Sequence, residues 1–155
     1  MAGQIDARLS ELGIELPEAA PSVANYVPYV VSGNLVFVSG QVTIVNGEFK
    51  YIGKVGSDLS TEQGQEAARV CALNIIAQVK AACGGDLDRV VRIVKLGGFV
   101  NSTPDFKDQP KVINGASDVM VEVFGDKGKH ARAAVSAGSL PLGVAVEVDA
   151  VVEIA

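Results

Sequence analysis

Apolar residues recur with helical spacing in three segments of the chain. Residues 3–13 carry isoleucine and leucine three and four positions apart, which predicts a short amphipathic helix that Gly13 can end. Residues 60–82 open with Ser60 and carry one continuous apolar stripe, which predicts a long helix that begins with a capping box. Apolar positions across residues 112–124 predict a second long helix, which the glycines after it would end.

Five other segments are rich in β-branched and aromatic residues or alternate between apolar and polar positions, as strands do. They lie at residues 26–45, 48–52, 87–101, 130–137 and 144–154. The dipeptides Gly33-Asn34 and Asn46-Gly47 are typical two-residue hairpin turns, so the first strands are expected to form a meander. Gly97-Gly98 indicates either a bulge or a close approach of the backbone within its strand.

The order of these segments is a β-meander, a helix, a strand, a helix and a final β-hairpin. This order predicts an α+β sandwich with the long helices on one face of the sheet, rather than a strictly alternating α/β fold. A chain of 155 residues suits one domain with one core. Residues 1–155 are therefore expected to form a single domain, in which residues 1–23 are an N-terminal helix and its connector.

Composition and charge argue against several classes of partner. The net charge is -5 and the thirteen basic residues are scattered, so nucleic acid is not an expected partner. No apolar run approaches the ~18 residues that a membrane span requires. One histidine and two cysteines without ligand spacing predict no metal site.

The two cysteines bear on the cellular compartment. Cys71 and Cys83 fall in one predicted helix, about 18 Å apart at the rise of an α-helix, which is too far for a disulfide. Free thiols fit a reducing compartment, and the charged first dozen residues contain no apolar core of a signal peptide. A cytoplasmic protein is expected.

The last two strand segments bring charged residues into one candidate site. If Pro141 centres a hairpin turn, antiparallel pairing would put Arg132 opposite about Asp149 and Ala134 opposite about Glu147, on one face. Arg132 could then form a structural cross-strand ion pair. Alternatively, one carboxylate could hold the guanidinium while it binds an anionic ligand in a bidentate fork. The residues alone do not decide between these two interpretations.

Residues 130–150, HARAAVSAGSLPLGVAVEVDA, resemble the signature of the reactive intermediate deaminase (YjgF-like) family, in which Ala-Arg-x-x-Val precedes a Leu-Pro turn and a Glu-bearing strand. Further similar motifs stand in the family's order upstream. They are Tyr26, Gly33-Asn34, Val38-Ser39-Gly40-Gln41, Asp105-Phe106 and Asn114. The resemblance spans about residues 24–155 and identifies the chain as a member of a divergent subgroup of this family.

The resemblance implies a chorismate-mutase-like α+β fold, a two-layer sandwich with a mixed sheet, and a homotrimer with clefts between subunits. It implies hydrolysis of reactive 2-imino acids to 2-oxo acids and ammonia, without a cofactor. By position, Arg132 would clamp the substrate carboxylate and Glu147 would position or activate the attacking water. Tyr26 and Asn114 would line the pocket, and the backbone of Ala134 would hydrogen-bond the substrate.

Departures from the family pattern keep other functions open. Ala134 stands where many members have cysteine, the loop between Phe106 and Asn114 is longer, and the N-terminal helix is extra. A non-catalytic module that binds a 2-oxo acid in the same clefts is the alternative to a deaminase. A ribonuclease or translation inhibitor, another label used in the family, fits the acidic charge less well.

Overall fold

A computed structural model describes residues 3–22 and 24–155. The helices are α1 (Gln4–Glu11), α2 (Thr61–Ala82) and α3 (Gln109–Phe124), with short 3-10 turns η1 (Leu87–Arg89), η2 (Gly125–Gly128) and η3 (Pro141–Gly143). The strands are β1 (Tyr29–Ser32), β2 (Leu35–Gln41), β3 (Ile44–Val45), β4 (Glu48–Phe49), β5 (Val90–Asn101), β6 (Ala131–Ala137) and β7 (Val146–Ile154). Residues 1, 2 and 23 of the predicted N-terminal helix and connector lie outside the described residues.

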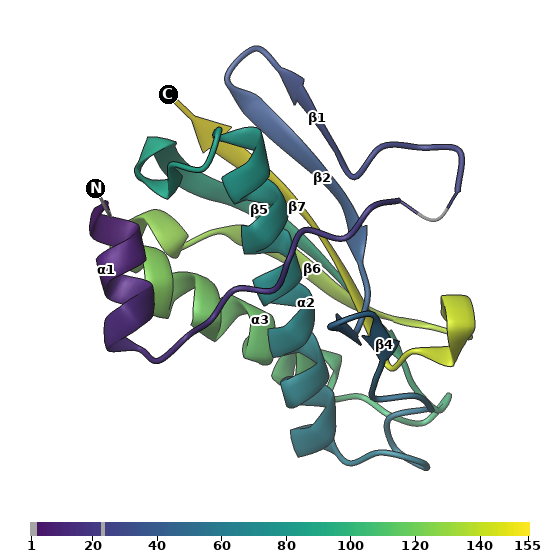
Figure 1. The fold of residues 1–155 in the computed structure, drawn as a ribbon. Coiled ribbons are helices and arrows are strands. Elements are labelled where there is room, and N and C mark those ends of the chain that lie inside the picture. The colour runs from purple at the N-terminus through teal and green to yellow at the C-terminus, as the bar shows by residue number, and fades with distance from the viewer. Residues whose placement is uncertain (1–2, 23) are drawn as a thin grey trace.

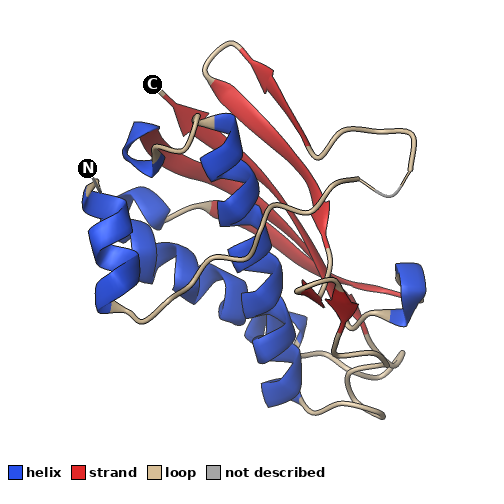
Figure 2. Ribbon diagram, in the orientation of Figure 1, coloured by secondary structure: helices blue, strands red, loops and turns tan. Residues whose placement is uncertain are grey.

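Five strands form one mixed sheet in the order β1-β2-β7-β5-β6, and β3 and β4 form a separate two-stranded sheet. Strand β5 runs parallel to β6 and antiparallel to β7. Helices α2 and α3 lie together on one face of the large sheet, as Figures 1 and 2 show. The predicted two-layer α+β sandwich, with two long helices on one face and a short N-terminal helix, is confirmed. We call the sheet face opposite the helices the open face.

Local sequence signals account for the long helix α2 and for both early hairpins. The hydroxyl of Ser60 accepts the backbone N–H of Gln63 at 3.1 Å, and the Gln63 side chain accepts the Ser60 N–H at 2.9 Å, so the predicted capping box is present. The turn at Gly33-Asn34 joins β1 to β2, and the turn at Asn46-Gly47 joins β3 to β4. Asn46 and Gly47 both adopt positive φ, the backbone conformation that such hairpin turns require.

The two glycines in β5 are positions of close approach. A Cβ added at Gly98 would lie 2.6 Å from the Ile113 side chain of α3, and one added at Gly97 would lie 2.3 Å from the Asp149 carboxylate. Gly98 therefore faces the helices, while Gly97 and Asp149 face the open side. Of the two predicted explanations for this dipeptide, the structure supports close approach, because the register shifts of β5 lie nearer its start.

The prediction of a final β-hairpin is wrong. Strands β6 and β7 do not pair, because β5 lies between them and pairs with both. Arg132 stands beside Leu96 of β5, and Ala134 stands beside Gly98, so both side chains lie on the helix-bearing face. Asp149 and Glu147 lie on the open face, so the expected Arg132–Asp149 and Ala134–Glu147 pairs do not exist.

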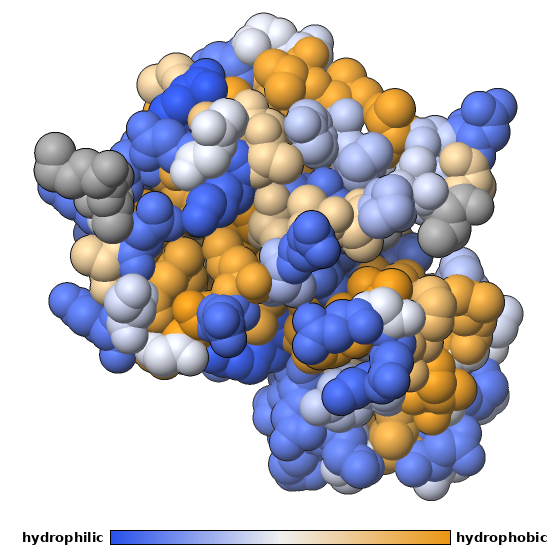
Figure 3. Space-filling view, in the orientation of Figure 1, coloured by the Kyte–Doolittle hydropathy of each residue, from blue (hydrophilic) through white to orange (hydrophobic). Residues whose placement is uncertain are grey.

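The N-terminal helix α1 packs on the helix layer. The Asp88 carboxylate accepts the backbone N–H groups of Gln4 and Ile5, each at 2.9 Å, and Arg8 donates to the Glu122 carbonyl at 2.9 Å. On the side drawn in Figure 3, polar side chains break the apolar surface into separate patches. Within residues 3–22 and 24–155, no helix has the length and apolar character to span a bilayer.

Candidate functional site

Arg132 lies near the start of the edge strand β6 and reaches across to helix α3. Its Nη1 donates to the Asn114 side-chain oxygen at 2.9 Å and to the Ser117 hydroxyl at 3.0 Å. Its Nη2 donates to the Pro110 carbonyl at 3.3 Å. The structure therefore brings together two of the predicted site residues, Arg132 and Asn114.

The partners of the Arg132 guanidinium are all uncharged. No carboxylate of the described residues lies within ion-pair distance of it, although five other ion pairs are present in this part of the chain. A guanidinium carries five N–H groups, and the three hydrogen bonds leave Nε and one Nη2 hydrogen without an acceptor among the described residues. A partly buried cation with uncommitted donors on one edge is suited to bind an anion such as a carboxylate.

Ala134 lies two residues further along β6, beside Gly98. Its side chain is partly buried and packs against the core, on the same face as Arg132. Because β6 is an edge strand, some of its backbone N–H and C=O groups have no neighbouring strand to pair with. The backbone here is therefore close to Arg132 and accessible along the sheet edge.

Tyr26 and Glu147 line a different hollow, of about 290 Å³. Gly40 forms part of its wall, and a Cβ added there would lie 2.8 Å from the Glu147 side chain, so the hollow opens beside Glu147 on the open face. Phe49 and Leu142 add apolar surface to the same wall. A second pair of predicted residues thus comes together, one from the loop before β1 and one from β7.

Glu147 is partly buried and forms no hydrogen bond or ion pair with the described residues. Burial raises the pKa of the Glu147 carboxyl, and the negative charge of Asp149 on the same face raises it further. A carboxyl group whose pKa is shifted toward neutrality exchanges protons more readily near physiological pH. Glu147 therefore has the properties of a general base or acid beside a partly apolar hollow.

The two pairs of residues do not meet within one chain. Arg132 and Asn114 lie between the edge strand β6 and α3 on the helix-bearing face, whereas Glu147 and Tyr26 lie at the hollow on the open face. Strand β5 separates β6 from β7, so Arg132 and Glu147 are two strands apart as well as on opposite faces. One chain thus contains two halves of the predicted site.

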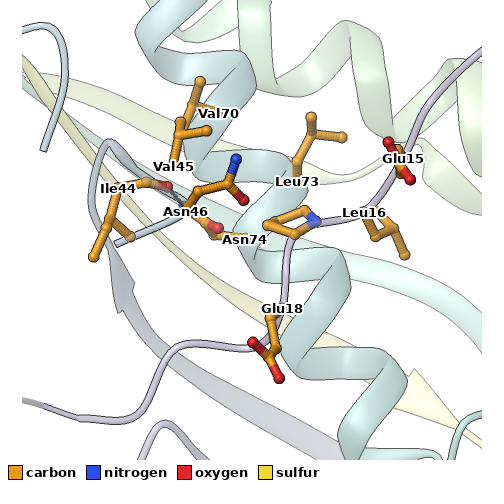
Figure 4. Close-up of a pocket in the computed structure, with 10 residues that line it drawn as sticks. Glu15, Leu16, Glu18, Ile44, Val45, Asn46, Val70, Leu73 and Asn74 are labelled. Atoms are coloured by element: carbon orange, nitrogen blue, oxygen red, sulfur yellow. Dashed lines mark hydrogen bonds between the residues drawn. The ribbon is translucent and has the colours of Figure 1, made fainter. Parts of the chain in front are cut away.

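A larger hollow of about 410 Å³ lies between the N-terminal connector and α2, and none of the five predicted site residues lines it. Figure 4 shows Glu15, Leu16 and Glu18 of the connector opposite Leu73 and Asn74. Asn74 uses its side-chain nitrogen to hold the carbonyls of Val42 and Ile44, both at 3.0 Å. This hollow is a junction of packed segments, and the side-chain nitrogen of Asn74 is already bonded to the backbone.

The described residues contain no group of three or more His, Cys, Asp or Glu side chains arranged to hold a metal ion. Both cysteines are buried, and they form no disulfide, as their predicted separation requires. Burial strongly raises the pKa of the Cys71 thiol, and the nearby Glu147 carboxylate adds to that rise. A thiol held protonated in this way is a core residue, not a nucleophile.

Sequence reasoning missed Ser117 and the Pro110 carbonyl as partners of Arg132. Ser117 follows Asn114 by three positions, so on a helix both residues face the same way. That spacing was the available signal. The carbonyl of Pro110 had no such signal, because every residue type has a backbone carbonyl.

Comparison with known proteins gives consistent matches over nearly the whole chain. A protein-family model matches residues 6–154. Its description reads "YjgF/chorismate_mutase-like" and adds an endoribonuclease label. Protein TCP17 of Trypanosoma cruzi is 51% identical over 154 residues, which cover 99% of this chain and 96% of that protein.

Two solved structures are also similar to this chain. One is the crystal structure of Atu1372 from Agrobacterium tumefaciens, a protein described as of unknown function, which is 52% identical in sequence and superposes with a TM-score of 0.91. The match covers 97% of this chain and 92% of that chain. A structure from Shewanella oneidensis MR-1, also described with an endoribonuclease label, is 36% identical with a TM-score of 0.94, and covers 98% of this chain and 100% of that chain.

Proposed function

Since this chain belongs to the YjgF/chorismate-mutase-like family, also called the reactive intermediate deaminase family, we propose that it hydrolyses 2-imino acids to 2-oxo acids and ammonia. The observation that carries the proposal is the state of Arg132. Its guanidinium is fixed by neutral partners, has no acidic partner among the described residues and keeps donors uncommitted. A small carboxylate would supply the missing negative charge in a bidentate fork.

The chemistry requires little beyond orientation and proton transfer. An oxygen lone pair of water attacks the imine carbon, a C–O bond forms, and the electron pair of the C=N bond moves to nitrogen. Glu147 accepts a proton from the attacking water and returns it to the nitrogen, which gives the neutral carbinolamine. Glu147 then accepts the proton of the carbinolamine hydroxyl and passes it to the nitrogen as well. The oxygen lone pair forms the carbonyl of the 2-oxo acid as the C–N bond breaks and ammonia leaves. Burial beside Asp149 raises the pKa of Glu147, which favours both halves of this proton transfer.

A second copy of the chain would complete the site. The half with Arg132 and Asn114 and the half with Tyr26 and Glu147 face in different directions, so a cleft that contains both requires contact between unlike surfaces of two protomers. Such heterologous contacts close into rings, and a homotrimer is the ring that we propose. The open face supports an interface, because Val30, Phe37 and Val135 are 51%, 45% and 47% exposed on it.

Hydrolysis of RNA is a less suitable function for this site. The endoribonuclease label belongs to the family model and to the Shewanella oneidensis structure. This chain has a net charge of -5, and its thirteen basic residues are scattered along the sequence rather than gathered in a run that could hold a phosphate backbone. The single fixed guanidinium suits one carboxylate better than a polyanion.

Substitution of Arg132 tests the proposal. We expect Arg132→Ala to lower kcat/KM for 2-iminopropionate on the order of a hundredfold, because two charge-assisted hydrogen bonds to the carboxylate are lost. The imine is generated in the assay, and the enzymatic rate is its loss in excess of spontaneous hydrolysis. Arg92→Ala is the matched control, since Arg92 is exposed on β5 of the same sheet.

Three outcomes separate the possible functions. Equal rates in Arg132→Ala and wild type would remove the deaminase assignment. Saturable binding of pyruvate that depends on Arg132, without any turnover of the imine, would assign a carboxylate-binding module instead. A rate deficit confined to Arg132→Ala would support the deaminase.

A further inference from the structure

A chain of hydrogen bonds runs from Arg132 back into the protein, away from the edge that is free for a ligand. The Ser117 hydroxyl lies 3.0 Å from Arg132 Nη1 and 2.9 Å from His130 Nε2. The other ring nitrogen of His130, Nδ1, lies 2.6 Å from the Gly128 carbonyl. Three elements, β6, α3 and η2, are thus joined through side chains that no step of imine hydrolysis uses.

Chemistry fixes the donor and the acceptor of every hydrogen bond in this series. The Gly128 carbonyl can only accept, so His130 Nδ1 donates to it. Arg132 Nη1 can only donate, so the Ser117 oxygen accepts from it. In the neutral ring, Nε2 then carries a lone pair and accepts the Ser117 hydroxyl proton. Every donor in this series of hydrogen bonds therefore has an acceptor.

The end of this series of hydrogen bonds at Gly128 is anchored in rigid structure. Gly128 is buried, and a Cβ added there would lie 2.1 Å from the carbonyl oxygen of Met120, so η2 lies directly against α3. The ring of His130 therefore bonds to a carbonyl that cannot shift without moving the helix. Asn114, the other acceptor of Nη1, lies on the same helix.

We infer that Ser117 and His130 are positioning residues for the carboxylate clamp: they fix the Nη1 end of Arg132 so that Nε and Nη2 are presented to the ligand. This inference rests on the proposed function of Arg132. A long arginine side chain loses considerable rotamer entropy when a ligand immobilises it, and a preorganised guanidinium avoids most of that cost on binding. The expected consequence is tighter binding of 2-oxo and 2-imino acids.

A Ser–His pair could also be an activated nucleophile, and kinetics separate the two roles. The Ser117 oxygen already accepts from Arg132, which engages one of its lone pairs with the guanidinium. As a positioning residue, Ser117 should affect KM for the imine and Kd for pyruvate. As a nucleophile, it would affect kcat and leave Kd unchanged.

The first experiment uses the single histidine of the chain as its own reporter. In a long-range 1H–15N spectrum of labelled protein, we expect His130 to have its proton on Nδ1. Addition of pyruvate should shift the His130 resonances in wild type and leave them in place in Arg132→Ala. A proton on Nε2, or shifts that persist without Arg132, would overturn the inference.

The second experiment compares paired variants by calorimetric titration with pyruvate. Ser117→Ala and His130→Leu remove the hydroxyl and its acceptor, and each should raise Kd roughly tenfold, the effect of one lost hydrogen bond. Ser117→Thr and His130→Gln keep a hydroxyl and an acceptor at the same places and should restore most of the affinity. Thermal unfolding of all four variants reports whether they fold.

The outcomes distinguish this inference from the proposed function. If Arg132→Ala loses binding while Ser117→Ala and His130→Leu bind as wild type does, the positioning role is refuted and the function stands. If Arg132→Ala itself binds pyruvate normally, the proposed function fails. If the conservative variants bind as weakly as the disruptive ones, the hydrogen bonds are not what positions the guanidinium.

Discussion

At the scale of single residues, the environment of Glu147 predicts a specific loss of activity. Glu147→Gln keeps the size of the side chain but can neither accept nor return a proton. We expect kcat for imine hydrolysis to fall about 100-fold to 10,000-fold, the usual contribution of a general base. Pyruvate should still bind with wild-type affinity, because the proposed carboxylate clamp is Arg132. Turnover and calorimetry on one preparation measure both quantities.

Asp149 should influence the same reaction through charge alone. Its carboxylate is the second cause of the raised pKa of Glu147, after burial. Asp149→Asn removes that charge, so the pKa of Glu147 should fall toward the ordinary value. A base is active when ionised, and the acidic limb of the kcat profile should therefore move to lower pH. An unchanged limb in this variant would exclude Glu147 as the titrating base.

At the scale of elements, the contact between α1 and η1 predicts an acid-sensitive helix. The N–H groups of Ile5 and Gln4 lower the pKa of the Asp88 carboxyl, which accepts both. Because the pKa is lower in the folded state, this stabilisation is present above the unfolded pKa and is lost as pH falls through the folded pKa. We expect hydrogen exchange of α1 amides to lose protection at acidic pH before the sheet does. Asp88→Ala should remove that protection already at neutral pH.

The crossing of α2 and α3 depends on Gly115. A Cβ added there would lie 2.1 Å from the backbone oxygen of Gln65, and backbone cannot rotate away as a side chain can. Gly115→Ala should therefore push the helices apart and cost on the order of 1–3 kcal/mol of folding free energy, or more. Gly138→Ala is the matched control, since nothing lies within 4 Å of a Cβ there. Equal melting temperatures for the two variants would contradict this account.

Elements that depend on neighbouring residues in the chain could be predicted from the sequence. Helix α2 and the turns at Gly33-Asn34 and Asn46-Gly47 follow from capping and turn chemistry. The partner of β6 was not predicted correctly, because the short connection around Pro141 resembles a hairpin turn. A strand, a long helix and another strand are also the pattern of a parallel crossover, and this weaker signal gives the observed pairing of β5 with β6.

The same limit applies to the candidate site. Arg132 and Asn114 stand in recognisable motifs, and the structure joins them directly. The acids expected beside Arg132 are two strands away on the other face, because the identity of the central strand is a property of the whole sheet. The family resemblance therefore supplied the candidate residues, but the sequence did not predict that they fall into two separate groups.

At the scale of the whole molecule, the proposed division of the site between protomers predicts complementation between two inactive variants. Arg132→Ala retains the half with Glu147, and Glu147→Gln retains the half with Arg132. When the two chains are co-expressed, a cleft that receives Arg132 from one variant and Glu147 from the other is intact. Random mixing in a ring makes about a quarter of the clefts intact, so about a quarter of wild-type activity should return. Mixtures prepared without subunit exchange should stay inactive. If both residues acted from the same chain, co-expression would restore nothing, and light scattering on the same samples would show whether the ring had formed.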